Sequence, residues 1–560
     1  MDIASNDADA LTPLVIDDVG AVIWSDTADV IVVGFGGAGV VAALQAREDG
    51  ADVLAIDRFD GGGATAYSGG VYYGGGTRFQ REAGYEDTPE EMFKYLSVEA
   101  KGVVSDETME RFCRNNNRDL EWLMSHGVPY GSTLEMSKTA YPRDDKYLYF
   151  SGNERVGRYA EIARPAPRGH RALGKGFTGV VHYSALRNSA ERLGVRILTH
   201  APVSRLVVDK EGGIVGVEVS EVPPEALAEH RNLYTKVNPM VPFKAKQAEA
   251  AIADAAALEA RTVRPRFIRA RGGVILSTGG FAYNLKMLEK YRPFVARNYT
   301  SIMRLGSMGC DGSGIRLGQS AGGATDLMES TFLAKSLAPP NGLLYGIAVN
   351  QRGERFINED AYTGFVGQAI SEQPNGDAWL ILNNAAVWKI FRAAFKPGDR
   401  SQFSYFILPT LLNLFLGGTR RARTAEALAR KCGMEAAGLK QTLADYDRHA
   451  VSHTDPLGKN PDYIKPLGTG SYTAVRLSTS NHYGFTQLFT LGGLVVDERN
   501  GQVRGSDGQP IRGLYAAGRT AVGLCSRGYI SGMSIADTVF SGRRAGEAVA
   551  RTLNDRSTAS

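Results

Sequence analysis

A glycine-rich turn near the N-terminus carries the first chemical signal in the sequence. Residues 34–39 read G-x-G-x-x-G; they follow the mostly apolar run 28–33 and open the helical pattern 40–49. A second apolar run, 51–56, ends at Asp57. Glycines allow close backbone approach to a pyrophosphate, the helix N-terminus faces it, and the acid accepts from a ribose hydroxyl. The order strand, turn, helix, strand and acid predicts a dinucleotide site.

Further glycine-rich stretches favour FAD over NAD. Residues 61–70 read GGGATAYSGG, glycines recur at 74–76, and a backbone of this kind can approach a flat ring. Another turn, 278–280, follows the apolar run 273–277, and a last cluster spans 518–532 near the other end of the chain. We expect the two ends to form two walls of one site. The predicted cofactor contacts are Gly34, Gly36, Gly37, Ala38, Gly39, Asp57, Arg58, Thr65, Ser68, Gly69, Gly70, Thr278, Gly279, Gly280, Gly518, Arg519, Ser534 and Ile535.

The composition narrows the function classes. The chain has 560 residues with 43% hydrophobic composition, which suits a large globular protein of two to four domains. Lys and Arg exceed Asp and Glu by only four, with no sustained basic run, so a nucleic-acid surface is not expected. The sequence therefore favours a small-molecule partner.

Cysteine and histidine spacing predicts neither a disulfide framework nor a metal site. The four cysteines are scattered without a C-x-x-C motif, which suits reduced thiols in a cytoplasm. His449 and His453 have helical spacing, but no third ligand is evident nearby. Residues 1–27 are acidic and do not resemble a secretory signal, so cytoplasmic residence is expected.

One apolar stretch, Phe403–Leu416, is shorter than the roughly 20 apolar residues that span a bilayer. It could still contact a membrane surface or an apolar substrate, although a buried helix explains it at least as well. Peripheral membrane association is therefore left open.

The pattern of elements predicts an α/β fold with an inserted, α+β cap. An N-terminal extension at 1–27 is followed by a Rossmann-like cofactor domain at 28–291, with a probable structural insertion at 221–266. Residues 292–465 are expected to form the cap, and 466–560 to complete the first domain and close on a helix from 532 to about 553. The predicted molecule is bilobal.

These motifs together resemble the fumarate reductase/succinate dehydrogenase flavoprotein superfamily. The resemblance covers about 28–550 apart from the insertion and implies FAD in one lobe with substrate held between flavin and cap. Gly63 stands where succinate dehydrogenases carry the covalent histidine, which implies noncovalent FAD, and Arg519 replaces the usual glutamate. The matching segments are 34–39, Asp57, 68–70, 278–280, 353–359, 491–493 and 514–518.

Departures from the dicarboxylate-using members indicate a different substrate. Those members use a histidine and arginines to hold two carboxylates, whereas this chain has Phe489, Tyr529 and Tyr362 at the matching positions. A neutral, apolar, oxygen-bearing substrate is expected. Tyr529-x-Ser531-Gly532 is similar to the 3-ketosteroid dehydrogenases of the Δ4-(5α) type.

This resemblance implies a C4–C5 dehydrogenation in which the flavin and individual residues have distinct roles. Flavin N5 would take the C5 hydride, while the Tyr529 hydroxyl and a backbone N–H near Gly532 polarise the C3 carbonyl. Tyr362 would remove the C4 proton and Ser531 would relay it; Tyr345 is the reserve base. An external acceptor would then reoxidise the flavin.

Three alternatives remain at this stage. The first is a 3-ketosteroid Δ1-dehydrogenase. The second is a reductase of an unsaturated acid, which Arg304, Arg316 or Arg527 would serve. The third is a flavin-carrying electron-transfer subunit within a larger assembly.

Overall fold

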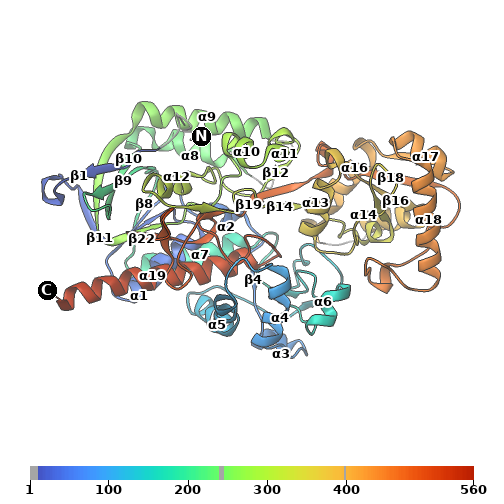
Figure 1. The fold of residues 1–560 in the computed structure, drawn as a ribbon, viewed down its shortest axis with the longest axis horizontal. Coiled ribbons are helices and arrows are strands. Elements are labelled where there is room, and N and C mark those ends of the chain that lie inside the picture. Colours follow the sequence, from blue (N-terminus) through green and yellow to red (C-terminus); the bar gives the residue numbers. More distant parts are fainter. Residues whose placement is uncertain (1–10, 239–244, 396–398, 560) are drawn as a thin grey trace.

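The computed structural model describes residues 11–238, 245–395 and 399–559 and has two lobes (Figure 1). The larger lobe is built on a nine-stranded sheet, and the smaller one on a four-stranded sheet. Strands β14 (Thr331–Ala334) and β19 (Gln487–Thr490), which pair with each other, run between them. This arrangement agrees with the bilobal α/β prediction.

The core of the large sheet is parallel. Its order is β8, β3, β2, β11, with β22 pairing with the second half of β11. β3 and the second halves of β2 and β11 are buried apolar runs, as expected where both faces of a sheet are covered. Their bounds are Arg196–Leu198 (β8), Val53–Ile56 (β3), Asp26–Val33 (β2), Arg264–Leu276 (β11) and Pro510–Ala516 (β22).

The register of these strands aligns their carboxyl ends. Val33 is paired with Ile56 on one side and Leu276 on the other, and Leu276 is paired with Ala516. The glycine turns that follow β2, β11 and β22 therefore open at one edge of the sheet. Ligands of open α/β sheets bind at this edge.

The sheet continues on the side of β11 with antiparallel strands. β10 (Ile214–Glu221) pairs with β9 (Val203–Asp209), which in turn pairs in parallel with β1 (Leu14–Ile16). Part of the predicted N-terminal extension thus belongs to the sheet. The remaining edge strand, β21 (Gln502–Arg504), pairs with β22.

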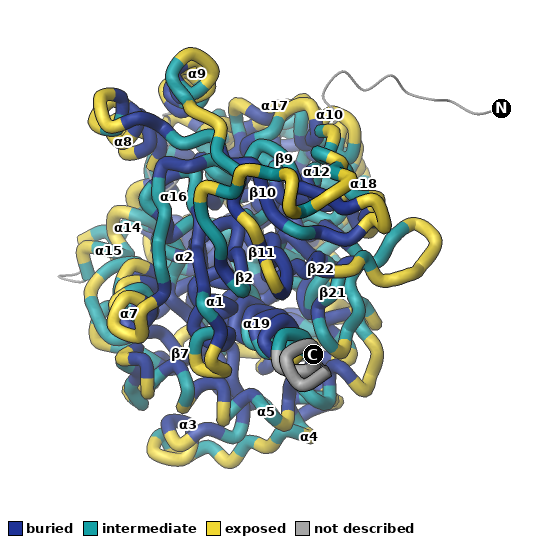
Figure 2. The backbone as a smooth tube through the Cα atoms, turned by 90° about the vertical axis from the view of Figure 1, so that its left-hand side faces the viewer, coloured by how far each residue is buried: buried dark blue, intermediate teal, exposed yellow. Residues whose placement is uncertain are grey.

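Helix α1 (Gly37–Glu48) and the C-terminal helix α19 (Met533–Ala559) pack together beneath the sheet (Figures 1 and 2). Glycines on α19 allow this approach: a Cβ on Gly542 would lie 2.8 Å from the Ala38 carbonyl oxygen. Gly546 contacts the Ala42 carbonyl in the same way. The helix that follows the first glycine cluster and the helix that follows the second therefore lie side by side, and a Cβ on Gly518 would lie 2.8 Å from that of Ala38.

The described residues of the inserted segment include two α-helices on the outside of the lobe, α8 (Leu227–Thr235) and α9 (Ala245–Thr262) (Figure 2). The same lobe contains α2 (Gly63–Tyr67) and α7 (Gly179–Arg192), which pack on each other and on α1, and a small sheet with its helices. That sheet contains β4 (Val71–Tyr73), β7 (Gly169–Arg171), β6 (Leu148–Tyr149) and β5 (Leu134–Glu135), and the helices are α3 (Arg78–Glu82), α4 (Pro89–Glu99), α5 (Asp106–Ser125) and α6 (Gly157–Ile162).

The cap sheet has the order β15, β16, β18, β17. Its last strand in sequence, β18 (Tyr472–Arg476), lies beyond the predicted boundary at 465, while α12 (Ser313–Ser320) packs on β9 and β11 of the large lobe. The cap is therefore shifted toward the C-terminus relative to 292–465. Its other elements are β15 (Ile347–Val349), β16 (Trp379–Asn383), β17 (Arg420–Ala422), α13 (Thr363–Ser371), α14 (Asn384–Phe395), α15 (Arg400–Gln402), α16 (Leu408–Leu416), α17 (Ala425–Cys432) and α18 (Ala436–Val451).

The apolar stretch Phe403–Leu416 is helical throughout. A π-helical turn, Phe403–Ile407, continues into α16. In the described part of the chain, no helix has the length and apolar character needed to cross a bilayer.

Candidate active site

A cavity of about 480 Å³ lies at the carboxyl edge of the large sheet and extends to the junction with the cap. Most of the predicted site residues line it. Those that do are Gly34, Gly36, Gly37, Ala38, Asp57, Arg58, Thr65, Ser68, Gly69, Thr278, Gly279, Tyr362, Gly518, Arg519, Tyr529, Ser531, Gly532, Ser534 and Ile535.

Three predicted glycines lie behind the wall instead of on it. A side chain on Gly39 would overlap the Gly34 carbonyl, one on Gly70 would lie 2.6 Å from Thr178 backbone atoms, and one on Gly280 would overlap Thr490. These glycines therefore shape the cavity by allowing elements to approach closely.

The first turn of the cavity suits a pyrophosphate. Gly34 has φ +92°, a conformation that other residues adopt rarely, and it turns the chain from β2 into α1. The N-terminus of α1 opens toward the cavity at Gly37 and Ala38. Free backbone N–H groups and the helix dipole at this point favour an anion.

Asp57 lies half-buried beside this turn. Its carboxylate accepts hydrogen bonds from the backbone N–H groups of Phe35 (2.7 Å) and Phe59 (2.8 Å). Burial raises its pKa, and these bonds partly oppose that rise. A carboxylate fixed in this way keeps lone pairs for a ribose hydroxyl.

The inserted helices contribute to the cavity, a role that the sequence did not suggest. Tyr234 of α8 stacks on Phe59 at 4.6 Å between ring centroids, and Glu259 of α9 pairs with Arg58. Arg58 also contacts Asp311 at 2.8 Å. Tyr234 and Glu259 line the cavity, so the insertion closes its nucleotide end.

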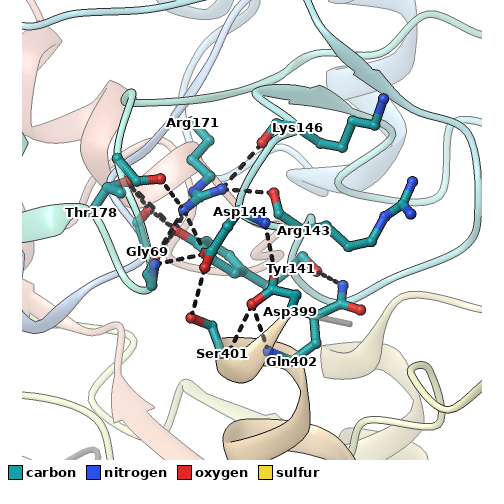
Figure 3. Close-up of polar contacts among 12 residues, drawn as sticks. Gly69, Tyr141, Arg143, Asp144, Lys146, Arg171, Thr178, Asp399, Ser401 and Gln402 are labelled. Carbon is teal, nitrogen blue, oxygen red and sulfur yellow. Dashed lines mark hydrogen bonds and ion pairs between the residues drawn. The ribbon is translucent and has the colours of Figure 1, made fainter. Parts of the chain in front are cut away.

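The loop after α2 is held by a buried arginine from a neighbouring strand (Figure 3). Arg171 of β7 is fully buried and donates to the Tyr141 hydroxyl (2.8 Å), which donates to the Gly69 carbonyl (2.7 Å). Thr178 donates to the same carbonyl at 3.0 Å. Gly69 thus has a fixed backbone position at the cavity wall.

The same cluster reaches the cap (Figure 3). Asp144, which pairs with Arg171, accepts from Ser401, and its N–H donates to Asp399 at 2.5 Å. Gln402 donates to the Tyr141 carbonyl at 3.0 Å. The start of the helical stretch 399–416 is therefore connected to the loop that contains Gly69.

Four aromatic rings enclose the end of the cavity nearest the cap. Phe332 of β14 stacks on Phe489 of β19 at 4.6 Å, and both meet Tyr529 edge-on, at 4.7 and 4.8 Å. Tyr362, just before α13, lies 6.4 Å from Tyr529 between ring centroids. Phe332 was not predicted, because no motif marks it; only its place on a strand next to β19 brings it here.

Burial sets the chemistry of both tyrosines. Withdrawal from water raises the pKa of Tyr362 well above its usual value, and the neighbouring Tyr529 adds to this rise. Burial also raises the pKa of Tyr529, while Arg519 and the Gly532 N–H act in the opposite direction. Both hydroxyls therefore carry their protons near neutral pH and can donate hydrogen bonds.

Ser531 has a partner that the sequence did not reveal. Its hydroxyl lies 2.9 Å from the hydroxyl of Tyr149 on β6, and Ser151 donates to the Ser531 carbonyl at 2.9 Å. Gly532 follows with φ +99°, and a Cβ there would lie 2.9 Å from the Tyr73 nitrogen. The turn into α19 is thus packed against the small sheet.

Tyr345, the reserve candidate base, lies away from the cavity. Its ring packs edge-on against Tyr463 at 5.9 Å, and the ammonium of Lys389 lies 4.6 Å from its centroid. It is absent from the cavity lining. The structure therefore does not bring it together with Tyr362 and Tyr529.

Of the three arginines considered for a carboxylate clamp, only Arg316 lines the cavity. It lies on α12, whose Gly314 N–H donates to Thr278 near the dinucleotide turns. Arg304 is buried against Glu249, and Arg527 is exposed. Arg519 is the guanidinium near the aromatic end, at 4.9 Å from the Phe489 ring centroid.

Comparisons with known proteins agree with this geometry. The FAD binding domain family model matches residues 29–532. The 3-oxo-5-alpha-steroid 4-dehydrogenase of Comamonas testosteroni is 37% identical over 514 residues, covering 90% of this chain and 94% of the relative.

Solved structures give the same result. A 3-ketosteroid-delta4-(5alpha)-dehydrogenase from Rhodococcus jostii RHA1, in complex with 4-androstene-3,17-dione, has a TM-score of 0.78 at 32% identity, covering 96% of this chain and all of the other. A flavocytochrome c3 fumarate reductase is similar in fold alone, with a TM-score of 0.60 at 24% identity, 94% of this chain and 79% of the other.

Proposed function

This chain belongs to the FAD binding domain family, and we propose that it is an FAD-dependent 3-oxosteroid dehydrogenase that introduces the C4–C5 double bond. The single observation that supports this best is the aromatic end of the cavity, where Phe332, Tyr362, Phe489 and Tyr529 surround the space beside the cofactor turns. Such a wall suits a flat apolar ketone. It does not suit a dicarboxylate, which needs paired cationic donors.

The residues present fit FAD. Bound FAD supplies the hydride acceptor for this chemistry. The turn at Gly34 would hold its pyrophosphate, Asp57 a ribose, and the loop at Gly69 its ring. Gly63, which has no side chain that could bond to the flavin, lines the cavity, which supports noncovalent binding.

We assign the carbonyl contact to Tyr529 and the backbone N–H of Gly532. A protonated tyrosine hydroxyl and an N–H aimed at the C3 oxygen would stabilise the enolate that forms when the C4 proton leaves. The raised pKa of Tyr529 suits this role, since the hydroxyl must keep its proton.

Tyr362 is assigned to the C4 proton. A tyrosine with a raised pKa is a poor base by itself, so the proton must be passed on as it is taken. Tyr149 lies close enough to raise the pKa of Tyr362 and is hydrogen-bonded to the hydroxyl of Ser531, so the proton would pass along these hydroxyls.

The test is an anaerobic spectrum of the holoprotein with a 5α-saturated 3-ketosteroid, a 4-ene-3-ketosteroid or succinate. Bleaching of the oxidised flavin band by the saturated ketone, with formation of the 4-ene product, is the expected result. Bleaching only by the 4-ene compound would assign Δ1 chemistry instead. If no steroid bleaches the flavin while an unsaturated acid reoxidises the dithionite-reduced protein, the reductase function replaces this one.

We also propose that the cap contacts a membrane surface through α14 and the stretch 403–416. Trp388 and Phe395 of α14 are 67% and 84% exposed, and Phe415 and Leu416 are 67% and 57% exposed. Phe391 links Trp388 to Phe415 through ring contacts of 6.5 and 6.0 Å. We call Trp388, Phe391, Phe395, Phe415 and Leu416 the apolar patch.

Charge near the apolar patch suits anionic lipid. Among the described residues from 384 to 421 the cations are Lys389, Arg392, Arg400, Arg420 and Arg421, and the one carboxylate is Asp399. Asp399 already accepts from backbone N–H groups. Phe406, on the same helical stretch, lines the cavity, so a substrate dissolved in lipid would be close to its binding site.

A further inference from the structure

Glu99, the last residue of α4, lies outside the cavity but is connected to both active-site tyrosines. It is 1% exposed, and no sequence motif marks it. One of its carboxylate oxygens, Oε1, accepts from the hydroxyl of Tyr95 (2.5 Å) and from the side-chain amide of Asn153 (2.9 Å). Glu99 thus fixes a side chain on the loop between β6 and α6.

Asn153 transmits this contact to Tyr362. It is fully buried, and its Oδ1 accepts from the backbone N–H of Tyr362 at 2.7 Å, while its own N–H donates to Tyr95 at 2.7 Å. Because its amide NH₂ faces Glu99, its oxygen must face Tyr362. Rotation of the amide would place donor against donor.

A second connection runs to the segment that holds Tyr529. Gly528 lies against the Glu99 backbone so closely that a Cβ there would overlap the Glu99 carbonyl oxygen. On the loop that contains Asn153, a Cβ on Gly152 would lie 3.1 Å from Cγ2 of Ile530. Residues on both sides of Tyr529 therefore pack on Glu99 and on the neighbour of Asn153.

We propose that Glu99, acting through Asn153, is a positioning residue that fixes the separation of Tyr362 and Tyr529 in the active site. This role rests on the proposed function of the two tyrosines. The carboxylate makes no contact with the cavity and takes no part in the chemistry. Its contribution is to keep the Tyr362 backbone and the 528–530 segment in place relative to each other.

The charge of Glu99 would tune this contact. Burial raises its pKa to about 7, against the hydrogen bonds from Tyr95 and Asn153, and its second oxygen, Oε2, has no hydrogen-bond partner. An ionised acceptor makes stronger hydrogen bonds than a neutral one. Besides Tyr95, the charged and titratable groups that face it are Tyr73, Lys101, Lys138, Glu154, Arg158, Tyr159 and Tyr362.

The test compares Glu99→Gln and Asn153→Ala with wild type. Glu135→Gln is the matched control, since Glu135 is also a buried carboxylate but is bonded to Ser137 and Arg143. All four proteins are purified with FAD, and kcat and KM for a 5α-saturated 3-ketosteroid are measured from pH 5.5 to 9.

Wild-type kcat should rise through a step near pH 7. Glu99→Gln keeps an acceptor for Asn153 without the charge, so it should lose this step and show a kcat about tenfold lower at pH 8.5, with KM changed less than twofold. Asn153→Ala should be lower still at every pH. The control should retain both the step and the kcat. If Glu99→Gln shows the same pH profile and the same kcat as wild type, the proposal is overturned.

A second measurement does not depend on the substrate. Hydrogen exchange of the segment containing Tyr362 should be at least tenfold faster in Asn153→Ala, and faster in Glu99→Gln at pH 8.5, than in wild type or Glu135→Gln. Unchanged exchange would overturn the positioning role even if no steroid is turned over. Faster exchange without steroid turnover would instead place the failure in the proposed function.

Discussion

At the scale of single residues, burial decides what the active-site side chains can do. Tyr362 and Tyr529 both have raised pKa values because the enclosed site disfavours a phenolate. Two hydroxyls of one residue type can nevertheless act differently, since Tyr529 lies next to the Gly532 turn and Tyr362 lies beside the cap helix α13.

Replacement of Tyr529 by phenylalanine should remove activation of the carbonyl without disturbing the fold. Loss of one oxyanion donor lowers kcat by about 10²- to 10³-fold. We expect that loss with normal flavin content and little change in KM, measured by steady-state turnover with an artificial acceptor. Tyr345→Phe, outside the cavity, serves as the control and should stay within twofold of wild type. Equal losses in both variants would argue against the assignment.

The raised pKa of Glu99 also predicts that the stability of the fold depends on pH. Its folded pKa, about 7, is above the ordinary value of 4.5, so the folded state holds the proton more tightly than the unfolded state. The charge therefore destabilises the fold as pH rises from about 4.5 to about 7, by about 3 kcal/mol in total. The Tm of Glu99→Gln relative to wild type should become more positive between pH 5 and pH 8. A constant difference would contradict the raised pKa.

At the scale of elements, the alignment of β2, β11 and β22 creates the cofactor site. Each strand ends at the same edge, and each is followed by a glycine turn that lets its backbone line the cavity. The turns work together only because helix α1 can approach β2 closely at Gly39, where a side chain would overlap the Gly34 carbonyl and lie 2.9 Å from Ser277 Oγ.

Gly39→Ala should therefore remove the cofactor. Overpacking between β2 and α1 costs about 1–3 kcal/mol and displaces the pyrophosphate turn. We expect at least tenfold lower flavin occupancy after purification, measured from the absorbance ratio. Gly50→Ala, just beyond the other end of α1, meets no atom within 4 Å and should keep its flavin despite φ +92°. Full flavin occupancy in Gly39→Ala would show that this approach is not required.

At the scale of the whole molecule, the two lobes divide the work. The large lobe supplies the cofactor turns together with Tyr529 and Ser531, whereas the cap region supplies Tyr362 and Phe406. The apolar patch lies on the cap. A membrane contact there would leave the large lobe in water. Membrane binding and steroid turnover can therefore be measured as separate properties.

The apolar patch can be tested with a Trp388→Ser/Phe415→Ser double variant. Each exposed aromatic side chain contributes apolar area to a lipid contact, and each nearby cation adds about 1 kcal/mol on an anionic surface. Binding to phosphatidylserine vesicles, measured by sedimentation, should fall at least tenfold, with kcat for detergent-dissolved substrate unchanged. Ile23→Ser, an exposed apolar residue on the other lobe, is the control. Equal vesicle binding by both variants would remove the membrane proposal.

The sequence by itself determined the cofactor fold. The turn 34–39 with Asp57, and the glycines near 518, act through backbone conformations that only certain residue types allow, so short motifs were sufficient to predict the sheet edge, α1 and α19. The substitution of aromatic residues at 362, 489 and 529 likewise predicted an apolar site, because it depends on residue type.

Only the tertiary structure decided which distant residues complete the site. Phe332, Tyr149, Tyr234 and Glu259 carry no motif, and they reach the site through strand pairing or helix packing. Tyr345 precedes Tyr362 by 17 residues but lies outside the cavity, because β15 and the turn after it redirect the chain. The cap boundary also depended on long-range pairing of β18, which local sequence does not encode.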